Sequence, residues 1–231
     1  KNIGVSRAEV LATSAKILEK FGTPKNYADS VAESLVQAQE AGHASHGIIR
    51  LIEYTNSIEK KVIDPAAVPT IVRETGGTVV IDGHWGWGQI ACKFAVEVAS
   101  AKAKEFGISL ISVKNSSHCG ALGVYLYPAL DAGQIAMIFT NGPAVMPAVG
   151  GNAPLLSTSP IASGIPSNPP MIIDLSTSAV ARGKIATAAK AGGTIPEGWA
   201  VNAQGQPITD AKEALMGMLA PLGGAKGFAL G

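Results

Sequence analysis

The sequence predicts an α/β fold in which a helical N-terminal part precedes a domain with a layered sheet. Two observations predict it. Apolar residues recur at helical spacing up to about residue 60, and from Thr70 onward strand-like apolar runs alternate with helix-like stretches. Pro65 and Pro69 separate these two textures. We therefore expect a helical domain over residues 1–69 and an α/β domain over residues 70–231.

The N-terminal part is expected to contain three helices. The first follows a capping box, in which Ser6 caps the helix and Glu9 reaches back to it. Pro24 and the residues before it break that helix. The second helix is expected over residues 28–41, and the third is expected to begin near Ser45.

The second part is expected to alternate strands with helices. Its strand-like runs are Val79–Ile81, Ile108–Val113, Ile135–Phe139 and Met171–Ile173. Its helices are expected over Gln89–Lys104, Ala121–Asp131 and Ala179–Ala189. The segment 141–170 is dense in Gly, Pro and Ser, and a loop-rich segment of that length inside a compact domain is usually functional.

The bulk composition is typical of a globular enzyme. Of the 231 residues, 47% are hydrophobic and 15% are charged, and the net charge is +1. Because the sequence has no basic run and no apolar run of membrane-spanning length, neither nucleic acid nor a membrane is expected as a partner. Cys92 and Cys119 are expected to be reduced thiols, which together with the absence of a signal-peptide pattern indicates a cytoplasmic location.

Three of the four histidines lie in two polar, glycine-containing clusters. In the first cluster, Ser45 is placed as the N-cap of the third helix, so that His46, Arg50 and Tyr54 share one face at intervals of four residues. A helix N-terminus favours an anion, so we expect Arg50 to bind a carboxylate while His46 gives a proton to a neighbouring oxygen. The same spacing also fits a capped helix start with a surface arginine.

The second cluster places His118 just after a predicted strand. Catalytic groups often lie at the C-terminal ends of strands in α/β domains, and Gly120 allows the backbone to approach a ligand closely. A loop histidine bonded to its own backbone is the alternative. Metal binding by His43, His46, His118 and Cys119 is a further alternative, but the spacing matches no zinc pattern and no metal is expected.

The sequence contains no dinucleotide fingerprint and no phosphate-binding loop, because its glycine-rich stretches do not read GxGxxG. The run Asp174-Leu175-Ser176-Thr177-Ser178 follows a strand and is expected to open a helix. Its hydroxyl and N–H groups would then bind a phosphate or ribose, or simply cap that helix. Lys226 and Gly227 are expected on a flexible loop, which fits a phosphate-binding lysine or an ordinary turn.

Several motifs occur in a fixed order along the chain. They are Ser45-His46-Gly47 with Arg50 and Tyr54, Asn115 to Gly123, Asn141-Gly142-Pro143, Asp174 to Ser178, Ile195 to Trp199 and Pro221 to Gly227. Over nearly the whole chain this order resembles the type 2 malate/L-lactate dehydrogenases. That family also includes ureidoglycolate, sulfolactate and diketogulonate enzymes and cyclic-imine reductases.

The resemblance implies an NAD(P)-dependent oxidoreductase that forms a homodimer. It implies a non-Rossmann, mixed-sheet cofactor domain of the L-sulfolactate dehydrogenase-like fold. Members of the family continue well beyond Gly231, so we expect the chain to lack a C-terminal continuation.

The resemblance also implies roles for particular residues. His46 matches a histidine assigned as proton donor, His118 matches one assigned as proton acceptor, and Arg50 matches the arginine that binds the substrate carboxylate. Ser45 and Tyr54 are expected as further substrate-binding residues. The implied cofactor-binding residues are Asn141, Asp174, Leu175, Ser176, Thr177, Ser178, Lys226 and Gly227.

The expected reaction is hydride transfer between NAD or NADP and C2 of a small 2-hydroxy or 2-oxo acid such as malate or lactate. A reductase of a cyclic 2-imino acid on the same scaffold is one alternative. A carboxylate-binding protein without redox chemistry and a metal-dependent hydrolase that uses the histidines are two others. The sequence alone selects neither the substrate nor the cofactor.

Overall fold

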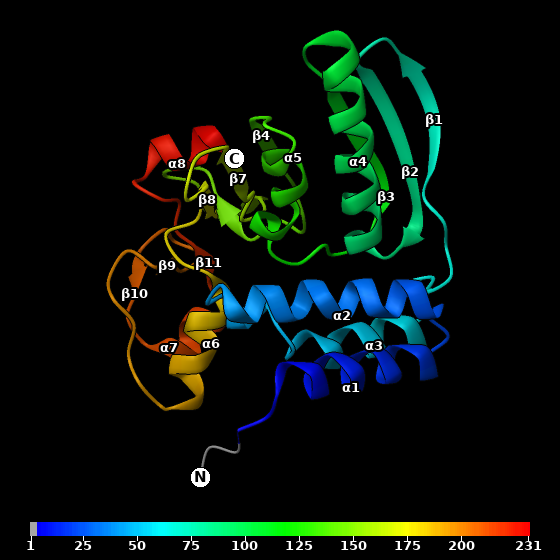
Figure 1. Ribbon diagram of the computed structural model, residues 1–231. Helices are drawn as coiled ribbons and strands as arrows, with labels where there is room; N and C mark the ends of the chain where they lie inside the picture. The colour runs from blue at the N-terminus through cyan, green and yellow to red at the C-terminus, as the bar shows by residue number, and fades with distance from the viewer. Residues whose placement is uncertain (1–3) are drawn as a thin grey trace. The chain divides into compact units, whose positions relative to one another are not determined.

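The computed structural model describes residues 4–231 (Figure 1). The chain forms two compact units. Unit 1 contains the chain up to Ala136 together with Gly164–Met171, and unit 2 contains Met137–Ser163 and Ile172–Gly231. Among the described residues, no helix combines the length and the apolar character that a membrane crossing requires.

Unit 1 begins with helices, as predicted. They are α1 (Arg7–Lys20), α2 (Lys25–Glu40), the 3₁₀ turn η1 (Ala44–His46) and α3 (Arg50–Glu59). The predicted capping box is confirmed, because the Glu9 N–H donates to Ser6 Oγ over 3.3 Å and the Ser6 N–H donates to Glu9 Oε2 over 3.0 Å. Two orphan N–H groups at the start of α1 are thereby satisfied.

The sheet of unit 1 is built around a helical crossover. Strands β1 (Thr70–Thr75) and β2 (Thr78–Gly86) pair antiparallel, and β3 (Leu110–Ser116) pairs parallel with β2. Helix α4 (Gly88–Phe106) connects the parallel pair, as a parallel connection requires. The short elements η2 (Leu122–Tyr125) and α5 (Tyr127–Asp131) replace the single helix predicted over 121–131.

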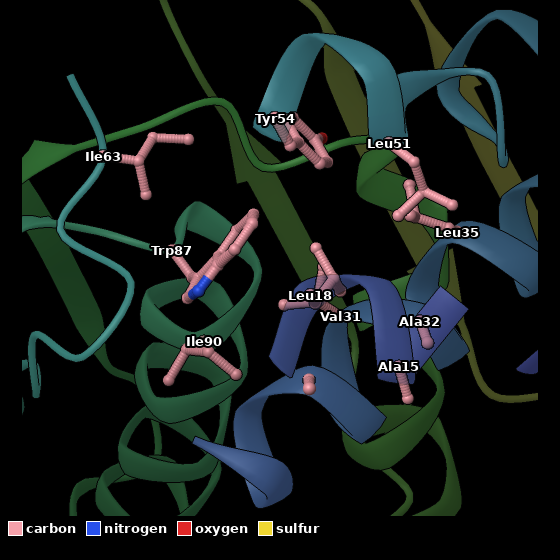
Figure 2. Close-up of a cluster of buried hydrophobic side chains, with 11 residues drawn as sticks. Ala15, Leu18, Val31, Ala32, Leu35, Leu51, Tyr54, Ile63, Trp87 and Ile90 are labelled. Atoms are coloured by element: carbon pink, nitrogen blue, oxygen red, sulfur yellow. The ribbon is translucent and has the colours of Figure 1, made fainter. Parts of the chain in front are cut away.

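One apolar core joins α4 to the N-terminal helices. Trp87 and Ile90, at the start of α4, pack in the same cluster as Leu18 of α1 and Leu35 of α2 (Figure 2). Burying these side chains supplies the main driving force for unit 1. This shared core places residues from both sides of the predicted boundary between residues 69 and 70 in unit 1, which continues to Ala136 and takes in Gly164–Met171.

Unit 2 consists of small sheets and short helices. Its strands are β4 (Ala136–Phe139), β5 (Met146–Pro147), β6 (Pro154–Leu156), β7 (Ile161–Ile165), β8 (Met171–Leu175), β9 (Ala200–Val201), β10 (Pro207–Ile208) and β11 (Met218–Leu219), of which β4, β7 and β8 cross the division between the units. The sheets have the strand orders β4-β7-β8, β10-β9-β11 and β5-β6. Its helices are α6 (Arg182–Lys190), α7 (Ala211–Met216) and α8 (Ala225–Leu230).

The core of unit 2 lies between α6, α7 and the β9 sheet. Ile185 of α6, Ala200 of β9, Ala214 of α7 and Leu219 of β11 are all buried there. The predicted fold class, helices followed by layered mixed sheets, is confirmed.

Candidate active site

The first histidine cluster does not form the helix start that the sequence predicted. Helix α3 begins at Arg50, and Ser45 and His46 lie before it on the separate turn η1. Gly47 interrupts the helical path with φ −87° and ψ −149°. A Cβ at Gly47 would collide with the Gln39 side chain, so this turn packs closely against α2. The predicted N-cap at Ser45 is therefore wrong, because the N-terminus of α3 lies at Arg50.

Side-chain contacts nevertheless bring the members of the first cluster together. The Ser45 hydroxyl lies 2.9 Å from His46 Nδ1, which fixes the orientation of the imidazole. Arg50 Nε donates to the Ser45 carbonyl over 2.7 Å and so ties α3 back to η1. The Arg50 side chain is 25% exposed, and its Nη1 forms an ion pair with Glu53. A guanidinium held in this way presents a rigid fork to a carboxylate.

Tyr54 links the first cluster to the second. Its ring is 1% exposed, and its hydroxyl lies 2.8 Å from Nδ1 of His118. Gln89 Nε2 donates to the same hydroxyl over 2.8 Å. Burial raises the pKa of Tyr54 above its ordinary value, so the phenol stays protonated at neutral pH. Gln89 was not among the predicted site residues.

His118 is held as a neutral imidazole. The protein atoms around its ring, and then the positive charges of Arg50 and His46, lower its pKa to about 4. Part of the ring remains open to solvent, so a ligand can reach it. The Gly120 N–H also points at Nδ1, over 3.3 Å.

The backbone before His118 is fixed against the start of α4. The Ser117 hydroxyl accepts from the Gly88 N–H over 3.0 Å and donates to the Gly86 carbonyl over 2.7 Å. A Cβ at Gly88 would collide with backbone atoms of Ser117 and His118. The glycine at position 88 is explained by this close approach.

A second set of contacts holds the end of β3. Asn115 has a left-handed backbone with φ 51°, and its side-chain amide donates to both oxygens of Asp82 over 3.1 Å. The His84 N–H first, and then Asn115 and Lys114, hold the pKa of the Asp82 carboxyl below its usual value. Asp82 thus acts as an acceptor that fixes the turn leading to His118.

The rings of His46 and His118 meet across this site. Their centroids lie 5.7 Å apart and their planes differ by 23°. All five predicted catalytic and substrate-binding residues therefore lie within one connected group in unit 1, namely Ser45, His46, Arg50, Tyr54 and His118. The group offers two imidazoles for proton transfer and one guanidinium for a carboxylate.

The proposed metal ligands do not gather into a site. Within residues 4–231, no three His, Cys, Asp or Glu side chains form a group that could hold a metal ion. Cys119, beside His118, is buried.

The predicted cofactor segments lie in unit 2. Asp174 and Leu175 end β8, but the helix that follows begins only at Arg182, after Ala181, which makes no side-chain cap. The prediction that this run opens a helix is therefore wrong. The Thr177 N–H donates to the Thr158 carbonyl over 2.9 Å, and the Ser178 hydroxyl donates to the Val180 carbonyl over 2.9 Å.

Lys226 lies in α8 rather than on a flexible loop, which corrects the second expectation for this region. The helix lies so close to the turn before it that a Cβ at Gly227 would collide with the Leu222 backbone. The Leu222 N–H donates to the Thr177 carbonyl over 2.8 Å, so the structure brings the segments 174–178 and 221–227 together. Asn141 follows β4 and is exposed.

The chain is similar to known dehydrogenases and reductases. A profile of the malate/L-lactate dehydrogenases matches residues 5–231. The L-sulfolactate dehydrogenase of Methanothermobacter thermautotrophicus is 39% identical over 228 residues, which are 98% of this chain and 67% of that protein. A Delta(1)-pyrroline-2-carboxylate reductase of Ancylobacter novellus is 37% identical over 99% of this chain and 67% of its own length.

The chain is also similar to solved structures of proteins of this kind. The malate dehydrogenase of Entamoeba histolytica superimposes with a TM-score of 0.95 at 34% identity, over 100% of this chain and 68% of that one. The sulfolactate dehydrogenase of Methanocaldococcus jannaschii gives a TM-score of 0.90 at 36% identity, over 98% of this chain and 66% of that one. The chain thus spans about two thirds of the length of these relatives. Both the profile and the relatives cover nearly the whole sequence, and the chain therefore belongs to the malate/L-lactate dehydrogenase family.

Proposed function

We propose that the protein is an NAD(P)-dependent oxidoreductase that interconverts a small 2-hydroxy acid and its 2-oxo acid. The observation that carries this proposal is the convergence of Arg50, His46 and His118 in unit 1. A 2-oxo acid carries a carboxylate beside a carbonyl, and its reduction needs a cation for the first and a proton for the oxygen of the second. The family relationship supports the same reaction class.

The two histidines take different roles in this proposal. His118, with a pKa of about 4, holds no extra proton at neutral pH, so it binds the substrate oxygen as a neutral hydrogen-bond donor. His46, oriented by Ser45, then donates the transferred proton to that oxygen as the hydride reaches C2. Arg50 holds the carboxylate, which fixes C2 relative to both rings.

The cofactor, when bound, supplies the hydride. The residue types in unit 2 fit a dinucleotide. Lys226 and Asn141 are exposed, and neither side chain forms a hydrogen bond or ion pair within the described residues 4–231. Ser176 adds a partly buried hydroxyl. An ammonium, an amide and a hydroxyl are suitable donors for phosphate and ribose oxygens. A relative from Chromohalobacter salexigens is named as NADP(+)-dependent.

Nicotinamide fluorescence tests this proposal directly. Full-length protein should bind NADH or NADPH saturably and should oxidise one of them when oxaloacetate, pyruvate or sulfopyruvate is added. Folded protein that binds neither nucleotide would contradict the redox function and would favour the carboxylate-binding alternative.

A second candidate function is reduction of a cyclic 2-imino acid. Glu53 lies beside Arg50 in an ion pair, so a negative charge accompanies the carboxylate-binding group. That charge favours a substrate with a protonated imine over a substrate with a second carboxylate. Comparing kcat/KM for pyrroline-2-carboxylate and oxaloacetate separates the two candidates. Glu53→Gln should shift that ratio toward oxaloacetate if the charge contributes to selection.

A further inference from the structure

We propose that Gln89 is a positioning residue that, through Tyr54, determines which ring nitrogen of His118 carries the proton. The proposal deepens the proposed function, since His118 acts on substrate only in that function. The hydrogen-bond chain from Gln89 to His118 follows from the geometry of unit 1 alone. Gln89 itself touches no reacting atom in this scheme and acts through two hydrogen bonds in series.

The three side chains form a short chain inside the protein. Gln89 is 1% exposed and lies in the first turn of α4, and its Nε2 donates to the Tyr54 hydroxyl over 2.8 Å. Tyr54 is equally buried, and its hydroxyl lies 2.8 Å from His118 Nδ1. Trp87 packs edge-on against the Tyr54 ring, with centroids 5.5 Å apart, and restricts its movement. Buried groups held in this way keep one hydrogen-bonding arrangement.

The direction of the chain follows from counting donors and acceptors. A tyrosine hydroxyl has one hydrogen and accepts through its oxygen. When the Gln89 amide donates to that oxygen, the hydroxyl hydrogen is left for His118 Nδ1. The Gly120 N–H also donates to Nδ1, over 3.3 Å, and a backbone N–H cannot accept. Nδ1 is therefore unprotonated, and the neutral ring carries its hydrogen on Nε2.

The reverse direction is disfavoured by the same atoms. If the Gln89 amide were rotated, its oxygen would accept the Tyr54 hydrogen, and Nδ1–H would donate to the Tyr54 oxygen. The hydrogens of Nδ1 and of the Gly120 N–H would then face each other. The amide NH₂ would replace Oε1 at a buried position where no partner lies within the described residues, and it would leave two hydrogens unsatisfied instead of one acceptor.

The consequence concerns the ring nitrogen that faces the substrate. With its hydrogen on Nε2, His118 can donate to the carbonyl oxygen of a 2-oxo acid. With its hydrogen on Nδ1, the same ring could only accept, and it would repel that oxygen. Gln89 thus sets a donor in place without approaching the substrate.

Nitrogen-15 NMR of the histidine rings tests the proposal in full-length protein, because the two tautomers give distinct nitrogen shifts. Wild-type His118 should carry its hydrogen on Nε2. In Gln89→Met the Tyr54 hydroxyl is no longer directed, and only the longer Gly120 contact still favours an unprotonated Nδ1, so the tautomer with hydrogen on Nδ1 should become populated beside the other. In Gln89→Glu the ionised carboxylate can only accept, so the hydrogen of His118 should move to Nδ1 as that carboxyl ionises. Gln134→Met is the matched control, because this substitution also removes one partly buried hydrogen bond, which the Gln134 amide donates to the Ser100 carbonyl.

Kinetics supply the second readout. Gln89→Met should lower kcat by roughly 10- to 100-fold with little change in KM, and Gln134→Met should change neither. Unchanged Nε2 protonation in both Gln89 variants would overturn the inference, even if they lose activity. A changed tautomer in a protein that never turns over a 2-oxo or 2-imino acid would support the inference and contradict the proposed function. If a Gln89 variant does not fold, Tyr54→Phe removes the same hydroxyl donor and should also mix the tautomers.

Discussion

The imidazole rings of His46 and His118 stack with 5.7 Å between their centroids, although one lies on η1 and the other follows β3. Two cationic rings at this separation repel each other, so the two imidazoles are not both cationic at neutral pH. The charge of His46 is among the causes that lower the pKa of His118. His118 is therefore the ring that stays neutral.

The first prediction separates the roles of the two rings. His46→Ala and His46→Asn should both lower kcat by about 10²- to 10⁴-fold, because neither alanine nor asparagine can act as a general acid. His118→Asn should retain more activity than His118→Ala, because the amide still donates a hydrogen bond. Steady-state kinetics with the preferred substrate measures all four. His43→Ala is the control, and equal losses in the two His118 variants would contradict the assignment.

The second prediction concerns substrate affinity. Arg50→Lys should raise KM and lower kcat/KM by roughly 10- to 100-fold, because an ammonium cannot form the bidentate pair with a carboxylate. Arg7→Lys is a matched control, since Arg7 forms ion pairs with Glu33 and Glu40 on the surface. A KM for Arg50→Lys equal to that of wild type would show that the carboxylate binds elsewhere.

The third prediction is a pH dependence of stability. The pKa of His118 is about 4 in the folded protein and 6.5 in an unfolded chain. Between these values the unfolded chain binds more protons, so the free energy of unfolding falls as the pH drops from 6.5 toward 4. The ring is partly exposed, which limits this contribution to about 1 kcal/mol.

Urea unfolding of wild type and of His118→Asn measures this contribution. The wild type should lose more stability than the variant between pH 7 and pH 4.5, because only the wild type carries the ring. The acidic groups common to both proteins, including Asp82, contribute equally to the pH dependence of both, so their contributions cancel in the comparison. Equal losses would mean that the pKa of His118 is not lowered by folding.

The fourth prediction concerns the contact between α4 and the loop that carries His118. Gly88→Ala should destabilise the protein by about 1–3 kcal/mol and displace His118, because the added Cβ meets the Ser117 and His118 backbone. Thermal unfolding and kcat measure the two effects. Gly193→Ala is the control, since a Cβ there meets only the Ala188 carbonyl at 3.6 Å. A stable Gly88→Ala protein with normal kcat would contradict the close approach.

Local signals in the sequence predicted much of the fold. The capping box at Ser6 and Glu9 is a four-residue pattern, and the strand before His118 is rich in Ile, Leu and Val, with serines between them. The candidate substrate-site residues were predicted from their types and from the family resemblance, and the structure places them in one connected group.

The parts that could not be predicted depend on contacts between distant segments. The close packing of Gly47 against the Gln39 side chain joins segments whose contact no local pattern shows. Gln89 lies 35 positions from Tyr54, and no pattern shows which polar residue of a helix will meet a buried hydroxyl. The inclusion of α4 in unit 1 depends on the core that it shares with the N-terminal helices.

The parallel pairing of β2 with β3 is also a condition for forming the site. Tyr54 and His118 are 64 positions apart, and α4 must cross over before β3 can dock beside β2. Closing such a loop costs chain entropy that only the completed sheet and core repay. The contact between Tyr54 and His118 therefore exists only where β3 has paired with β2, and any state in which β3 is undocked lacks the connected group of site residues.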